Sequence, residues 1–203
     1  MDYKFITRFF LCMGCLICMA CSHSNTFEDD LKSFLSKEVK LPLERMRMMC
    51  ADSCNLRDVG DKDWKLVVYT SPYKCAPCVV NGMYHWNEFI AWEDSLHGNF
   101  ELVFIFQPEK KDKKQLISSL KMSKLRSEAY VDTIGAFTEA NPDFPEDERL
   151  HVFLLNKENR VVLAGNPVEN KKMRNLMRQT ILKRKGGEWE KSKEQKDCRY
   201  VPH

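Results

Sequence analysis

The segment LVVYTSPYKCAPC, residues 66–78, joins two patterns that belong to different kinds of secondary structure. Its first five residues are aliphatic, β-branched or aromatic, which is typical of a buried strand. Ser71 and Pro72 interrupt that pattern, and the two cysteines that follow lie at the start of a helical pattern over 76–96. The segment therefore predicts a strand that leads directly into a helix, with a Cys-x-x-Cys pair at the junction.

Strand and helix patterns alternate on either side of this junction. Further strands are expected at 100–106, 128–132, 152–155 and 161–164. Helices are expected at 27–39, 112–123 and 168–184, and a short helix that ends at about residue 139 follows the strand at 128–132. Residues 43–63 fit neither pattern. The resulting order is β-α-β-α-β-α-β-β-α, with parallel units first and an antiparallel hairpin last. This order predicts an α/β fold with a mixed central sheet and helices on both faces.

The two thiols of the pair have chemistry that depends on their position. At a helix start, free N–H groups and the positive end of the helix dipole favour a thiolate at Cys75. A thiolate attacks disulfides, and Cys78, one turn away, can resolve the mixed disulfide. Ala76 and Pro77 shape the turn between them, and proline lacks an amide hydrogen and stiffens it. The pattern predicts a redox site.

The first 21 residues have the layout of a secretory signal. Two basic residues precede an apolar run that is too short to predict a transmembrane helix and that ends in Ala20-Cys21. This ending resembles a bacterial lipobox, in which the cysteine is lipidated. We therefore expect a lipoprotein-type signal peptide over 1–20 and a lipid on Cys21; an uncleaved N-terminal anchor is the alternative. Both alternatives place the rest of the chain outside the cytoplasm.

Strand 66–70, the Cys-Ala-Pro-Cys motif, helix 76–96 and the hairpin over 152–165 together resemble the thioredoxin superfamily, across about residues 62–184. With its anchored N-terminus, the chain looks most like the lipid-anchored periplasmic TlpA-like thiol-disulfide oxidoreductases. The resemblance implies a thioredoxin-like fold and an enzyme whose Cys75 attacks and whose Cys78 resolves. It implies no cofactor and no metal.

The resemblance also implies where the protein works and with what. Its partners would be cysteine-containing exported proteins and a membrane or periplasmic redox donor, and it would be lipid-anchored in the cell envelope, facing the periplasm. The net charge is +3 with both signs interleaved, which argues against nucleic acid as a partner. Four parts are expected: signal peptide 1–20, tether and N-terminal helical extension 21–61, thioredoxin-like domain 62–185, and polar tail 186–203.

Three positions depart from the family pattern. Lys74 stands where members usually carry a tryptophan, and Tyr69 where they usually carry a buried acid or asparagine. Leu150 or His151 takes the place of a cis-proline that normally faces the cysteines and helps to bind the partner. This departure favours an alternative function, a non-catalytic binding or scaffold lipoprotein with a passive disulfide. Lys74 and His151 could instead stabilise a thiolate, although an exposed loop lysine and a packing histidine are their ordinary roles.

The other cysteines leave several alternatives open. Cys50 and Cys54 could form a structural disulfide or a second redox pair that relays electrons to Cys78. Together with Cys75 and Cys78 they could also form a four-thiolate zinc site. Cys198 could be a free thiol or an intermolecular link. A peroxidase is a weaker possibility, because nothing around these cysteines matches a peroxidatic pocket.

Overall fold

A computed structural model of the chain describes residues 26–49, 62–96, 99–123 and 127–183. The predicted signal peptide, the predicted lipidation site Cys21 and the predicted polar tail lie outside these residues, as do Cys50, Cys54 and Cys198. In the described part of the chain, no helix is both long enough and apolar enough to cross a membrane.

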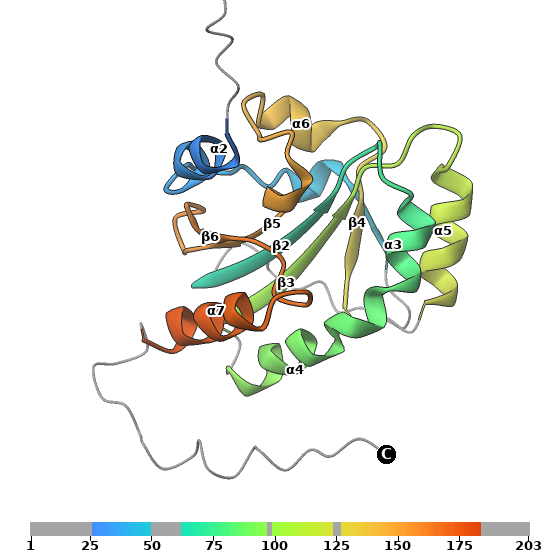
Figure 1. Ribbon diagram of the computed structural model, residues 1–203. Helices are drawn as coiled ribbons and strands as arrows, with labels where there is room; N and C mark the ends of the chain where they lie inside the picture. Colours follow the sequence, from blue (N-terminus) through green and yellow to red (C-terminus); the bar gives the residue numbers. More distant parts are fainter. Residues whose placement is uncertain (1–25, 50–61, 97–98, 124–126, 184–203) are drawn as a thin grey trace, which may run out of the picture.

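The described residues contain one sheet of six strands in the order β1-β4-β3-β2-β5-β6 (Figure 1). The strands are β1 (Arg47–Met49), β2 (Trp64–Thr70), β3 (Phe100–Phe106), β4 (Ala129–Val131), β5 (Val152–Leu155) and β6 (Val161–Ala164). Strands β2, β3 and β4 run parallel, while β5 and β6 form an antiparallel hairpin against β2. All five predicted strands are present. The sixth, β1, comes from the stretch that fitted no pattern and pairs antiparallel with β4.

Helices cover both faces of this sheet (Figure 1). The helices are α2 (Phe27–Phe34), α3 (Ala76–Asn81), α4 (Asn87–Ser95), α5 (Lys113–Met122), α6 (Ala136–Ala140) and α7 (Lys171–Lys183). Three 3₁₀ turns join them: η1 (Leu43–Arg45), η3 (Met83–Trp86) and η4 (Glu148–Leu150). Helices α3, α4, α5 and α7 pack on one face, and α2 and α6 on the other. The predicted fold class, a mixed sheet with helices on both faces, is confirmed.

The central strands are buried on both sides because both faces of the sheet are covered. Along β2, Leu66 and Val68 face the α3–α4 side, whereas Val67 and Tyr69 face the α2–α6 side. Each side chain of this size that is fully buried stabilises the fold by roughly 1.5–3 kcal/mol. The two apolar clusters hold β2 in place from both faces of the sheet. They therefore fix the position at which β2 ends and the loop after it begins.

The helix predicted over 76–96 begins where expected but is not continuous. It consists of α3, the 3₁₀ turn η3 and α4. Gly82 lies at the break, and its N–H donates to the Val79 carbonyl at 3.0 Å instead of continuing the α-helical pattern. Glycine is a poor helix former, which explains the interruption. Only six helical residues therefore follow Cys75 in regular α-helical geometry.

The helix predicted over 27–39 is also shorter, because α2 ends at Phe34. Ser36 adopts a positive φ of 67°, which turns the chain away from the helix axis. Ser36 then donates its N–H to the Val161 carbonyl at 2.7 Å, and Val39 donates to Asn159 at 2.9 Å. This segment covers the outer edge of β6, which would otherwise expose unpaired backbone groups.

Two buried residues with charged side chains lie at the amino ends of the central strands. Lys65 on β2 and Glu101 on β3 are register partners and are only 1% and 6% exposed. Glu101 Oε2 accepts no hydrogen bond from the described residues. Burial, and next the charge of Glu93, raise the pKa of Glu101 to about 7, against the opposing effect of Lys62 and Lys65.

Glu101→Gln should therefore change how stability depends on pH. The folded protein holds this proton more tightly than the unfolded chain, where the carboxyl titrates near 4.5. The stabilising contribution is thus complete below pH 4.5 and is lost as the pH rises through 7. As the pH rises from 4.5 to 7, the free energy of unfolding of the variant should therefore increase by about 3 kcal/mol relative to that of the parent protein. Urea unfolding of both proteins at the two pH values measures this, and a pH-independent difference would contradict it.

Candidate functional site

The two cysteines singled out by the sequence form a disulfide. Cys75 is the N-cap residue of α3, Cys78 lies in its first turn, and their Cα atoms are 5.3 Å apart. Both cysteines are exposed to solvent. Ala76 and Pro77 occupy the first two positions of α3, and their side chains lie outside the described part of the structure. The pair is thus placed where a partner's sulfur could reach it.

Helix α3, which begins at the cysteine pair, follows the carboxyl end of the central strand β2 (Figure 1). A short loop, residues 71–74, connects β2 to Cys75 and is closed by the Lys74 N–H, which donates to the Ser71 carbonyl at 3.1 Å. Within this loop Ser71 is buried, whereas Tyr73 is 90% exposed. The loop is therefore anchored at its strand end and open to solvent next to the cysteines.

A carboxylate from a distant part of the chain contacts this loop. Glu148, in η4, places Oε2 3.3 Å from the Lys74 ammonium, and its Oε1 accepts a hydrogen bond from the Ser71 hydroxyl at 3.2 Å. Sequence reasoning assigned no role to Glu148. Since 74 positions separate it from Lys74 and it belongs to no motif, no local signal in the sequence could have revealed this contact.

This chain has distant similarity to several solved structures. No family model matches the chain, and no curated protein matches it. Among solved structures, it is similar to a thioredoxin-like protein from Bacteroides caccae, with 13% identity, 74% of this chain and 52% of that chain covered, and a TM-score of 0.44. It is also similar to a thioredoxin-like protein in the oxidised form, with 17% identity, 68% and 88% covered, and a TM-score of 0.44.

A third similar structure is the thioredoxin domain of a thiol-disulfide oxidoreductase from Bacteroides vulgatus, with 16% identity, 66% of this chain and 94% of that chain covered, and a TM-score of 0.39. In this chain, the cysteine pair follows β2, β3 lies parallel on one side of β2, and the β5–β6 hairpin lies antiparallel on the other. The fold is thioredoxin-like. The chain spans about half the length of the Bacteroides caccae protein.

Leu150 and His151, which take the place of the family's cis-proline in the resemblance, lie directly before β5. Leu150 is fully buried in the cluster on the α2–α6 face. The His151 carbonyl accepts a hydrogen bond from the Tyr69 N–H at 2.9 Å, which extends the pairing of β5 with β2. No cis peptide bond occurs in the described residues. This segment therefore enters β5 as a regular extension of the ladder.

The His151 ring is held within the core. Its Nε2 lies 3.0 Å from the Pro145 carbonyl, and its ring centroid is 5.2 Å from that of Tyr69 and 5.3 Å from that of Phe144. Since a carbonyl only accepts hydrogen bonds, Nε2 carries a proton. Burial lowers the pKa of His151, so the ring is neutral at pH 7. Its contacts within the described chain are those of a packing residue.

Tyr69 occupies the position at which the resemblance expected an acid or asparagine. Its hydroxyl donates to Gln107 Oε1 at 2.8 Å, and Gln107 Nε2 donates to the Thr138 hydroxyl at 3.5 Å. Burial, and next the charge of Asp132, raise the pKa of the phenol, so Tyr69 remains neutral. Tyr69 therefore contributes no charge, and its hydrogen bond joins β2 to Gln107, the residue after β3.

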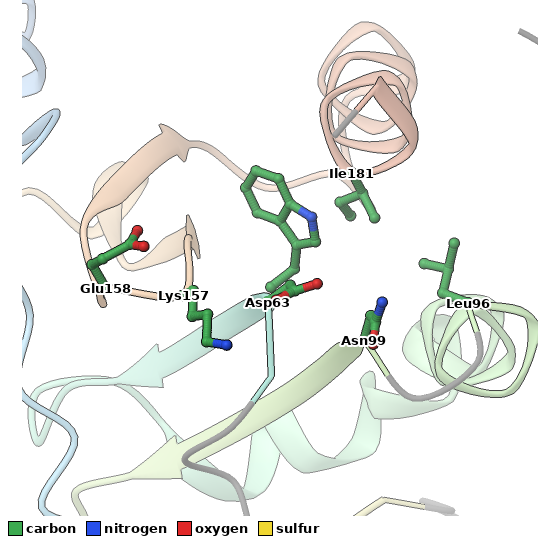
Figure 2. A pocket seen from close by; sticks show the side chains of 7 residues that line it. Asp63, Leu96, Asn99, Lys157, Glu158 and Ile181 are labelled. Carbon is green, nitrogen blue, oxygen red and sulfur yellow. The ribbon is translucent and has the colours of Figure 1, made fainter. Parts of the chain in front are cut away.

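A pocket lies at the opposite ends of the central strands, near the first residues of β2 and β3. Trp64 is one of the residues that line this pocket. Leu96 and Ile181 also line it, and Lys157 and Glu158 extend from the β5–β6 turn (Figure 2). It shares no residue with the disulfide site.

Among the described residues, no group of three histidine, cysteine or acidic side chains could hold a metal ion. The zinc alternative involves Cys50 and Cys54, which lie outside those residues.

Proposed function

We propose that this protein is an exported, membrane-anchored thiol-disulfide oxidoreductase. Its Cys75–Cys78 pair would alternate between dithiol and disulfide as it exchanges electrons with cysteines of envelope proteins. The observation that carries this proposal is the solvent-exposed disulfide at the junction of β2 and α3. Surface disulfides of this short spacing are open to attack by an incoming thiolate.

The proposed cycle balances in electrons and protons. In the reducing direction, the Cys75 thiolate attacks one sulfur of a partner disulfide, so a mixed disulfide forms and the partner's other sulfur leaves as a thiolate. The Cys78 thiolate then attacks the Cys75 sulfur and releases the partner's second thiolate. The partner gains two electrons and, from solvent, two protons. A dithiol donor restores the Cys75 and Cys78 thiols by the same exchange, and the oxidising direction is the reverse.

Export and anchoring rest on the sequence. The signal-like residues 1–20 and the lipobox-like Cys21 support a lipid anchor and a periplasm-facing domain. An oxidising compartment is also where protein disulfides persist, which is consistent with a disulfide that cycles. The partners would be cysteine-containing exported proteins, and the donor would lie in the membrane or the periplasm.

A second candidate function is a binding or scaffold lipoprotein with a passive disulfide. The arrangement before β5 favours it, because Leu150 is buried and the His151 backbone is paired with Tyr69. At this position, no proline is present to contact a partner's backbone beside the sulfurs. The two candidates differ in whether the disulfide exchanges with external thiols at a useful rate.

Equilibration of the purified protein with glutathione should separate the two candidates. For the oxidoreductase, we expect exchange within minutes and one thiol that titrates below the ordinary cysteine pKa of about 8.5. The measurement follows the thiolate absorbance against pH and the oxidised fraction against the ratio of reduced to oxidised glutathione. Two ordinary thiols, or a disulfide that resists exchange, would reject the oxidoreductase and leave the scaffold in its place.

A further inference from the structure

The loop before Cys75 is tied at both ends by one carboxylate. Glu148 accepts a hydrogen bond from Ser71, the first residue after β2, and pairs with Lys74, the last residue before Cys75. The two distances are 3.2 and 3.3 Å. A single side chain therefore links the strand end of loop 71–74 to its cysteine end.

The backbone of Glu148 is held in place by the fold. Asp147 caps η4 by accepting the Arg149 N–H at 2.9 Å, and Leu150, two residues after Glu148, is buried without exposed surface. The Leu150 N–H also donates to the Asp147 carbonyl at 2.9 Å. These contacts fix the backbone of η4, and the Glu148 carboxylate is therefore held against loop 71–74.

The charges around Cys75 give this contact a chemical consequence. A free ammonium next to a cysteine stabilises its thiolate, and a carboxylate that pairs with the ammonium reduces that effect. Near Glu148, His151 is neutral at pH 7, and Asp147 is paired with Arg149. Tyr73, between Ser71 and Lys74 in the same loop, is exposed to solvent.

We propose that Glu148 is a positioning residue that sets the reactivity of the Cys75 thiol, by holding Lys74 in an ion pair and fixing loop 71–74. This inference rests on the proposed oxidoreductase function. Because α3 has only six residues, the helix contributes few aligned peptide dipoles, and the Lys74–Glu148 pair is correspondingly more important. The side chains are 47% and 45% exposed, so solvent screening keeps the effect modest.

Glu148→Gln tests the inference because it removes the charge and keeps an oxygen that can accept from Ser71. We expect the pKa of the Cys75 thiol to fall by about half a unit. Since the reduced form is then stabilised, the equilibrium constant with glutathione should shift about threefold toward the dithiol. The matched control is Glu146→Gln, an exposed carboxylate two residues away, which should shift the pKa by less than a third as much.

A second background separates positioning from simple charge. If Glu148 acts by holding Lys74, the effect of Glu148→Gln should fall to less than half in a Lys74→Gln background. In the parent background it should also shrink when the salt concentration is raised from about 0.05 to about 1 M. Equal shifts in both backgrounds, or no shift in either, would overturn the inference.

The experiment distinguishes failure of this inference from failure of the proposed function. If the parent protein has two inert thiols, the oxidoreductase proposal fails before any variant is compared. If the parent exchanges rapidly and Glu148→Gln leaves the thiol titration unchanged, only the role of Glu148 is rejected. Unfolding curves of each variant establish that the folded states being compared are equally populated.

Discussion

Cys75→Ser is expected to lower the rate of disulfide exchange with a model disulfide by at least about 1,000-fold, because a serine hydroxyl does not form the nucleophilic anion at neutral pH. Cys78→Ser should behave differently. Its Cys75 can still attack, but the mixed disulfide is not resolved, so a stable adduct with glutathione should accumulate. Stopped-flow kinetics measures the first effect and mass spectrometry of the intact protein the second.

The control for both variants is Cys198→Ser, which removes a thiol from the C-terminal part of the chain and should leave the exchange rate unchanged. Retained exchange in Cys75→Ser would reject Cys75 as the attacking thiol. An adduct that accumulates in Cys75→Ser and not in Cys78→Ser would reverse the two roles. Because both cysteines are exposed, their accessibility alone does not distinguish them.

Asp132→Ala should cost the protein about 3–4 kcal/mol of unfolding free energy, the largest stability effect that we expect from a single polar side chain. Asp132 is fully buried after β4. Its Oδ1 accepts the N–H groups of Ile134, Gly135 and Ala136, and its Oδ2 accepts that of Phe137 at 2.8 Å. Alanine would leave these donors at the start of α6 without their acceptor.

Asp132→Asn should be milder, about 1–2 kcal/mol, because one carbonyl oxygen remains while an amide faces one of the donors. Asp112 provides a matched control, since it is the N-cap residue of α5 and its side chain makes no capping hydrogen bond. Asp112→Ala should change the free energy of unfolding by less than about 0.5 kcal/mol. Urea denaturation measures all three variants, and equal losses for Asp132→Ala and Asp112→Ala would contradict the capping role.

Local patterns predicted the elements of the sheet well, and their failures have physical causes. The apolar spacing of residues 27–39 is helical throughout, yet α2 ends at Phe34. Val39 is buried nevertheless, at 2% exposed, because the segment after α2 is extended and its backbone N–H donates to Asn159 in the turn before β6. Strand β1 was missed because three residues with one exposed side chain carry too little periodicity to detect.

The candidate site was predicted only where it is local. Cys75 and Cys78 are three residues apart, so their spacing and their place after a strand could be recognised in the sequence. The surroundings of Lys74 could not, because Glu148 reaches it through the pairing of β5 with β2. The environment of His151 was likewise left open, since its ring contacts come from Tyr69, Phe144 and the Pro145 carbonyl.

The sequence alone determined the order of the five predicted strands and of the helices. It also determined the buried character of β2 and β3 and the position of the cysteine pair, because each depends on neighbours within one element. The tertiary structure decided the pairing of β1 with β4, the capping of α6 by Asp132 and the contact of Glu148 with loop 71–74. The two long-range contacts join residues distant in the chain, and the cap depends on how the turn after β4 packs. The two contacts and the cap therefore form only when the strand register and the two buried clusters bring the interacting residues together.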